Sequence, residues 1–117
     1  MERLKRRQDF VAAAKGVYQA MPGFVLQALN RQDEKPARIG FTCTKKLGNA
    51  VMRNRIKRRL KEAVRLCLPP VTLSGFDYVV IGRAPARNRP FEVLQSDLIS
   101  AVTRLHAKAA APELRAP

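Results

Sequence analysis

The chain is poor in acidic side chains and in side chains that bind metals. Its 117 residues include nine aspartates and glutamates, one histidine and two cysteines. A nuclease that holds its own divalent ions needs several carboxylates converging on one place, whereas the acidic residues here are scattered through the sequence. There is also no Gly-rich phosphate loop and no Ser/His/Asp set. The sequence therefore predicts no catalytic residue and no metal site. His106, on an expected helix near the C-terminal end, is interpreted as a solvated residue.

Cysteine motifs and long apolar runs are also missing. Cys43 and Cys67 form no CxxC or Cys/His cluster, and each falls in an apolar pattern, so we expect two buried, reduced thiols. No apolar run approaches the roughly 20 residues that cross a bilayer. The basic segment 1–7 is not followed by the apolar core of a signal peptide. We therefore expect a cytoplasmic protein with no membrane partner.

Positive charge is the abundant feature. The chain holds 23 lysines and arginines, a net charge of +14 and a pI near 11.1. Its 46% hydrophobic and 27% charged residues are typical of a globular protein, and its length is that of one domain. Such a charge indicates a nucleic-acid partner. We expect the domain to span residues 1–108 and the low-complexity tail 109–117 to be disordered.

Much of this charge lies in residues 45–65, where nine basic residues and one acid give a net +8. Apolar residues recur at spacings of three and four, which predicts one buried face of a helix beginning near Ala50, with Asn49 as its N-cap. Arg53, Lys57 and Lys61 form a ladder of like charges, which destabilises a solvated helix. The ladder therefore favours a nucleic-acid partner over a solvated surface. The apolar residues are Met52, Ile56, Leu60, Ala63, Val64 and Cys67.

The remaining patterns predict an α+β domain. A helix is expected over residues 4–15, strands over 18–21, 24–29, 38–44 and 76–83, and a last helix over 91–108, in the order αβββαβα. The clean alternation of residues 38–44 gives that strand an apolar face and a face of small polar residues. The first face carries Ile39, Phe41 and Cys43, and the second Gly40, Thr42 and Thr44.

The segment 45–58 resembles the protein subunit of bacterial ribonuclease P, whose hallmark is an Arg-Asn-Arg helix after a strand ending in Lys-Lys. The matching residues are Lys45-Lys46 and Arg53-Asn54-Arg55, and further matches extend the resemblance from about Leu4 to Leu105. They are Asp9-Phe10, Gly16, Arg38-Ile39-Gly40-Phe41 and Asp77-Tyr78-Val79-Val80-Ile81. The resemblance implies an RNA-binding subunit of a ribonucleoprotein endonuclease. Its partners would be a large catalytic RNA and precursor tRNA, from which the enzyme removes the 5′ leader.

The resemblance also implies details of the fold and of the chemistry. It implies a single-domain αβββαβα sandwich with a mixed four-stranded sheet, of the ribosomal protein S5 domain 2-like type. The βαβ crossover would be left-handed, although general rules predict a right-handed one. It further implies that Mg2+ is held mainly by the RNA subunit. No cofactor bound by the protein and no obligate protein partner are expected.

Two RNA-binding surfaces are implied by the same resemblance. A cleft beside the first helix would bind the leader of precursor tRNA through Phe10, Val25, Gln27, Thr42, Arg53, Asn54, Lys57 and Lys61. The catalytic RNA would contact Lys45, Lys46, Arg55, Arg58, Arg59 and Arg65. Ala14 and Gln27 stand where other members carry aromatics, which leaves Phe10 as the one clear aromatic of the cleft. Phe10 could either stack on a base or pack in the core.

Two other classes of protein remain alternatives. A structural RNA-binding protein of the ribosomal type would bind ribosomal RNA and play no role in tRNA processing. A helix-turn-helix DNA-binding module would need a second short helix next to the basic one, but residues 39–44 have the pattern of a strand. The RNA that co-purifies with the protein would distinguish the first alternative from a ribonuclease P subunit.

Overall fold

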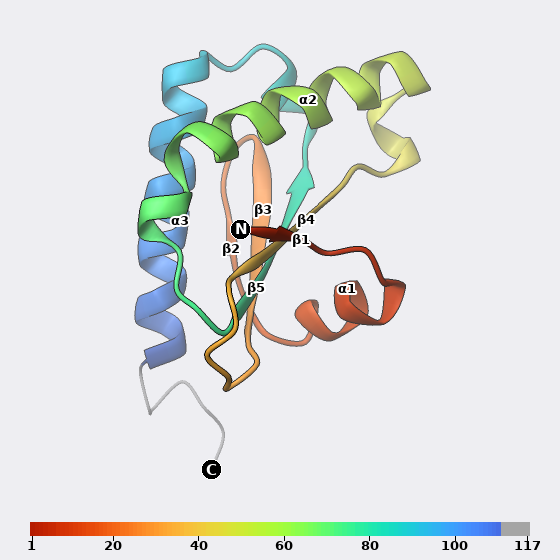
Figure 1. The fold of residues 1–117 in the computed structure, drawn as a ribbon. Helices are drawn as coiled ribbons and strands as arrows, with labels where there is room; N and C mark the ends of the chain where they lie inside the picture. The colour runs from red at the N-terminus through yellow and green to blue at the C-terminus, as the bar shows by residue number, and fades with distance from the viewer. Residues whose placement is uncertain (111–117) are drawn as a thin grey trace.

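A five-stranded mixed sheet forms the centre of the protein. The computed structural model describes residues 1–110, and the strands lie in the order β1-β4-β5-β3-β2 (Figure 1). Four of them match the expected strands, and the fifth, β1, is a two-residue edge strand that pairs parallel with β4. The expected four-stranded sheet is therefore wrong by one strand. The strands are β1 (Glu2–Arg3), β2 (Val17–Ala20), β3 (Phe24–Asn30), β4 (Arg38–Thr42) and β5 (Phe76–Gly82).

Three α-helices and three 3-10 helices connect and cover the strands. The α-helices are α1 (Arg7–Ala13), α2 (Ala50–Cys67) and α3 (Phe91–Ala110), and the 3-10 helices are η1 (Lys45–Leu47), η2 (Pro69–Val71) and η3 (Ala84–Arg87). Helix α1 starts later than expected because the Leu4 N–H donates to the Ile39 carbonyl and extends the pairing of β1. Among these helices, none is both long enough and apolar enough to cross a membrane. Ala109 and Ala110, assigned to the tail, belong to α3, while residues 111–117 lie outside the described part.

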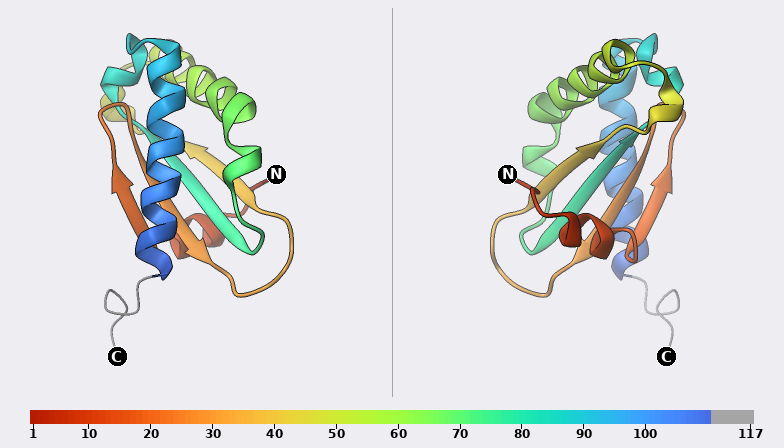
Figure 2. Two further views of the ribbon diagram at one scale, coloured as in Figure 1. Left: turned by 90° about the vertical axis from the view of Figure 1, so that its left-hand side faces the viewer. Right: turned by 90° about the vertical axis from the view of Figure 1, so that its right-hand side faces the viewer.

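The two faces of the sheet are covered unequally. Alternate residues of β3 and β5, such as Leu26 and Val80, pack with α2 and α3 in the main core. Within residues 1–110, the opposite face carries only the short helix α1, which packs with Leu4 and Val79 in a small second core. Figure 2 shows α3 in front of the sheet in one view and α1 in front of it in the opposite view. A seven-residue helix leaves part of its sheet face accessible.

Helix α2 connects the parallel neighbours β4 and β5. The Asn49 side chain accepts a hydrogen bond of 3.0 Å from the Met52 N–H, which confirms the expected N-cap. The helix crosses the end of β5 closely, since a Cβ on Gly82 would lie 2.9 Å from the Ile56 side chain. Seen from the α3 side with both strands pointing upward, β5 lies to the left of β4 (Figure 2). The crossover is therefore left-handed, as the resemblance implied.

Candidate nucleic-acid interface

A groove of about 490 Å³ lies between α1 and the accessible face of the sheet. The strand register places its sheet residues in two rows that run across three strands. Val25, Ile81 and Thr42 form one row, and Gln27, Val79 and Gly40 form the next. The side chains and backbone that line the groove come from Lys5, Arg7, Phe10, Ala14, Gln27, Phe41, Thr42, Val79 and Ile81. Three of the residues expected to bind the leader (Phe10, Gln27 and Thr42) therefore line the groove together, and Val25 is in the row of Thr42.

Phe10 both lines the groove and packs in the second core. Its ring lies directly over the Gly40 backbone, because a Cβ on Gly40 would be 2.5 Å from the Phe10 Cζ atom. The ring also packs against the cluster of Leu4, Ala13 and Val79 and remains half-buried. Of the two roles left open by the sequence, the structure shows the core packing, and stacking on a base stays a prediction. Ala14 is exposed at the groove, so its small side chain leaves space where an aromatic would stand.

Helix α2 contributes none of the residues that line the groove. Arg53 and Lys57 are half-buried, and the Arg53 guanidinium donates a 3.1 Å hydrogen bond to the Gly48 carbonyl. Asn54 is exposed. Lys61 lies on the other side of β4, with its Nζ 6.0 Å from the centre of the Phe41 ring. Lys61 therefore approaches Phe41 at the border of the groove but does not itself line the groove.

The outer face of α2 is exposed and basic. Arg55, Arg58 and Arg65 are exposed on it, and Lys45 and Lys46 are exposed in the adjacent η1. Within residues 1–110, none of the ion pairs involves the first two of these arginines. Arg65 pairs with Glu62 at 2.5 Å, and this hydrogen-bonded contact lowers the pKa of the Glu62 carboxyl. Arg55 and Arg58 are thus available to a polyanion.

Arg59 has a different role from the one expected. Its guanidinium donates hydrogen bonds to three carbonyls of the segment that connects β5 and α3. The acceptors are Ala86 at 2.6 Å, Arg87 at 3.0 Å and Arg89 at 2.7 Å. Both terminal nitrogens are occupied, so Arg59 holds this segment against α2. The structure thus gives Arg59 a structural function that the sequence did not predict, and its expected contact with the catalytic RNA stays a prediction.

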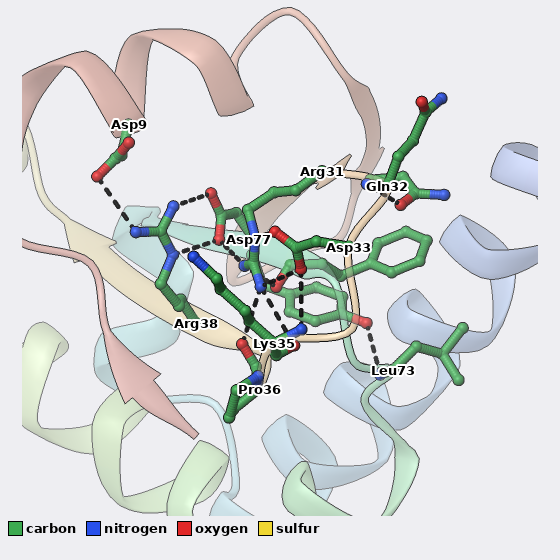
Figure 3. Close-up of polar contacts among 12 residues, drawn as sticks. Asp9, Arg31, Gln32, Asp33, Lys35, Pro36, Arg38, Leu73 and Asp77 are labelled. Atoms are coloured by element: carbon green, nitrogen blue, oxygen red, sulfur yellow. Dashed lines mark hydrogen bonds and ion pairs between the residues drawn. The ribbon is translucent and has the colours of Figure 1, made fainter.

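Asp77 is the centre of an ion-pair network on the α1 side of the sheet (Figure 3). Its carboxylate, 2% exposed, accepts hydrogen bonds from the Nε and a terminal nitrogen of Arg38, both at 2.7 Å, and a further one from Arg31. The hydrogen bond to Asp77 raises the pKa of Arg38. Arg38 also reaches Asp9 of α1 at 3.5 Å, while Arg31 binds Asp33. The network ties α1 and the β3–β4 loop to β5.

The sequence did not predict this network, although Arg38 and Asp77 belong to segments that match the family. They are direct partners in the parallel register of β4 and β5. The sequence did offer one signal for this ion pair, namely a basic residue at the start of one expected strand and an acidic residue at the start of another. His106 was also interpreted incorrectly. It is half-buried, and its Nε2 lies 2.7 Å from the Tyr78 hydroxyl.

Comparison with known proteins agrees with the sequence resemblance. The family model described as Ribonuclease P matches residues 1–106. The chain belongs to the ribonuclease P protein family. The ribonuclease P protein component of Gluconacetobacter diazotrophicus is 55% identical, over 82% of this chain and 84% of that protein. The ribonuclease P protein component of Ruegeria pomeroyi is 48% identical, over 89% of this chain and 86% of that protein.

Solved structures agree with this assignment. The ribonuclease P protein of Staphylococcus aureus matches with a TM-score of 0.72 and 31% identity, over 89% of this chain and 94% of that one. The ribonuclease P protein of Thermotoga maritima matches with the same TM-score and 28% identity, over 89% of this chain and 97% of that one. As a ribonuclease P protein, the chain is an RNA-binding subunit of a ribonucleoprotein endoribonuclease that acts in tRNA processing. It therefore associates with the RNA subunit of that enzyme.

Proposed function

We propose that the groove beside α1 binds the single-stranded 5′ leader of precursor tRNA. The observation that carries this proposal is the pair of residue rows across β3, β5 and β4, which leaves a shallow surface of small and apolar side chains. Such a surface admits a nucleic-acid backbone, and the half-buried Phe10 ring offers an edge to an unstacked base. Lys5 and Arg7, which line the groove, supply positive charge for phosphates.

A glutamate in place of Gln27 tests this proposal. The side chain keeps its size, but its negative charge would repel the leader's phosphates. We expect Gln27→Glu to weaken binding of precursor tRNA by the assembled enzyme several-fold, with no change for mature tRNA. Gln19→Glu is the matched control, because Gln19 lies on β2 opposite Leu26 and faces the α3 side. Equal losses in both variants, or equal losses with both RNAs, would refute the leader assignment.

The exposed outer face of α2 is proposed to bind the catalytic RNA. Arg55, Arg58, Arg65, Lys45 and Lys46 form this surface, which is distinct from the groove. Removing one cation that binds a phosphate should make the slope of log affinity against log salt shallower by about 0.7 to 0.9. Arg55→Ala/Arg58→Ala should therefore weaken assembly with a shallower slope, and leave the preference for leader-bearing RNA unchanged. An unchanged slope would exclude these contacts.

We further propose that Mg2+ and the cleavage chemistry belong to the RNA subunit. The donor chemistry of the described residues supports this, since five carboxylates pair with arginines and no three metal-binding side chains come together in residues 1–110. The isolated protein should cleave nothing, and adding the protein to the RNA should lower the Mg2+ concentration needed to cleave precursor tRNA. Cleavage by RNA-free protein would refute this. A cytoplasmic location is part of the same proposal.

A further inference from the structure

A second hollow, of about 580 Å³, lies on the other side of β4 from the groove. It is bounded by β1, β4 and α2, and its floor is apolar. Ile39, Phe41 and Val64 form this floor, and all three are almost fully buried in the main core. An apolar floor at the edge of a strongly basic surface can accept the flat face or edge of a ring.

Positive charge surrounds this floor. The Arg3 guanidinium carbon lies 5.9 Å from the centre of the Phe41 ring, and the Lys61 Nζ lies 6.0 Å from it. Both distances are within the range of cation–π contacts. Arg58 lines the same hollow and is exposed. Within residues 1–110, none of these three cations forms an ion pair with a carboxylate.

The nearby acid does not offset this charge. Glu62 also lines the hollow, but its carboxylate already holds two hydrogen bonds from Arg65. Burial lowers the pKa of Lys61, and the charges of Arg3 and Lys57 lower it further. Positive charges are thus held close together beside an apolar floor, an arrangement that an anion would stabilise.

We propose that this hollow binds one unpaired nucleotide of the enzyme's RNA subunit. The base would lie on the apolar floor against the Arg3 guanidinium plane, with its phosphate between Lys61 and Arg58. Unpaired bases stack on aromatic rings and on guanidinium planes, and lysine binds phosphate as a point charge. This proposal rests on the proposed contact between the outer face of α2 and the catalytic RNA.

The position of the hollow favours the RNA subunit over the leader. Strand β4 lies between the two, because Thr42 lines only the groove and Ile39 lines only the hollow, while Phe41 borders both. The hollow opens instead beside Arg58 and Arg65 of the outer face of α2. A nucleotide that enters it can therefore belong to the same RNA that contacts that face.

The free protein can be tested first with adenosine monophosphate as the probe and amide chemical shifts as the readout. We expect the nucleotide to shift the amides of β1, β4 and α2 around the hollow, and inorganic phosphate to shift them far less. Arg3→Lys keeps the charge but removes the planar group, and should weaken nucleotide binding about fivefold. Arg104→Lys, at an exposed position of α3 that lines neither the hollow nor the groove, is the matched control and should not. Equal effects of nucleotide and phosphate, or unchanged binding by Arg3→Lys, would overturn the proposal.

The assembled enzyme then separates the possible occupants. Arg3→Lys should weaken assembly with the RNA subunit severalfold at an unchanged salt slope, and Lys61→Gln should make that slope shallower by about 0.7. Neither should alter the preference for leader-bearing RNA. A loss of that preference with normal assembly would assign the hollow to the leader and overturn the proposal. If Arg55→Ala/Arg58→Ala changes the slope while Arg3→Lys has no effect, the α2 contact stands and the hollow fails.

Discussion

Two groups of arginines in this protein differ in what their guanidinium groups already bind, a difference that the sequence does not show. Arg31, Arg38 and Arg59 have their guanidinium groups occupied by carboxylates or backbone carbonyls. Arg55 and Arg58 are exposed and, within residues 1–110, form no ion pair. Net charge counts both groups equally. The first group builds the fold, whereas the second stays available to RNA, so the basic surface is smaller than the composition suggests.

The largest expected effect comes from the first group. Asp77→Asn removes the charge that holds Arg31 and Arg38, and leaves two partly buried cations without their anion. Breaking a buried ion pair in this way should lower the free energy of unfolding by about 3 kcal/mol. Urea unfolding monitored by circular dichroism would measure it. Glu62→Gln, which breaks an exposed pair, should change stability by less than about 0.5 kcal/mol. Similar losses in the two variants would remove the distinction between the groups.

The neighbours Arg58 and Arg59 give the sharpest test of the comparison. Arg59→Ala removes the hydrogen bonds to three carbonyls and should cost about 2 kcal/mol of stability, with an unchanged salt slope for RNA assembly. Arg58→Ala should show the reverse pattern, with stability within about 0.5 kcal/mol of the natural protein and a shallower slope. If both variants lose stability, or both change the slope, the division of arginines is wrong at this helix.

Each cysteine substitution should have a smaller effect. Cys43 and Cys67 are free and half-buried, not fully buried as expected, and burial raises the pKa of both thiols. Cys→Ala at either position should lower stability by roughly 1 kcal/mol through poorer packing and leave RNA binding intact. Loss of RNA binding in a variant with a normal unfolding curve would show that RNA recognition extends beyond the basic surfaces.

The smallest effect concerns a neutral contact, between Tyr78 and His106. The Tyr78 hydroxyl accepts a hydrogen bond from the Leu73 N–H and lies 2.7 Å from the His106 Nε2. Burial lowers the pKa of His106 and raises the pKa of Tyr78 to about 12. At His106 the unfolded chain therefore binds a proton more readily than the folded chain does. The free energy of unfolding should then fall as the pH drops below about 6.5. His106→Asn should flatten unfolding free energy against pH in that window; an unchanged profile would contradict this.

Much of the fold was predictable because its main signals are local. The apolar spacing and Asn49 located α2, and the alternation of β4 correctly placed Thr42 on the face with the groove. The two-residue β1 carries no such signal, since its pairing depends on β4. The left-handed crossover also has no local signal, because general rules predict the opposite hand. Only the resemblance to the family supplied it.

The candidate site was predictable where it depends on the sheet and less so where it depends on the helix. Residues four apart on a helix drift by about 40° around its axis. Over the two steps from Arg53 to Lys61 the drift is about 80°, enough to carry Lys61 past the edge of β4 to the Phe41 side. The structural role of Arg59 was missed for a different reason. Its partners belong to a segment almost 30 residues away, and spacing says nothing about where that segment folds.

The burial of Asp77 has a consequence for how reversible the assembly is. Salt screens exposed charges strongly, with a Debye length of about 10 Å at 0.1 M, but it screens buried pairs much less. The proposed contacts of α2 with RNA involve exposed charges, and the bonds that Asp77 makes involve a buried pair. Concentrated salt should therefore release the protein from its RNA partner while the chain stays folded, so that lowering the salt lets the particle form again without refolding.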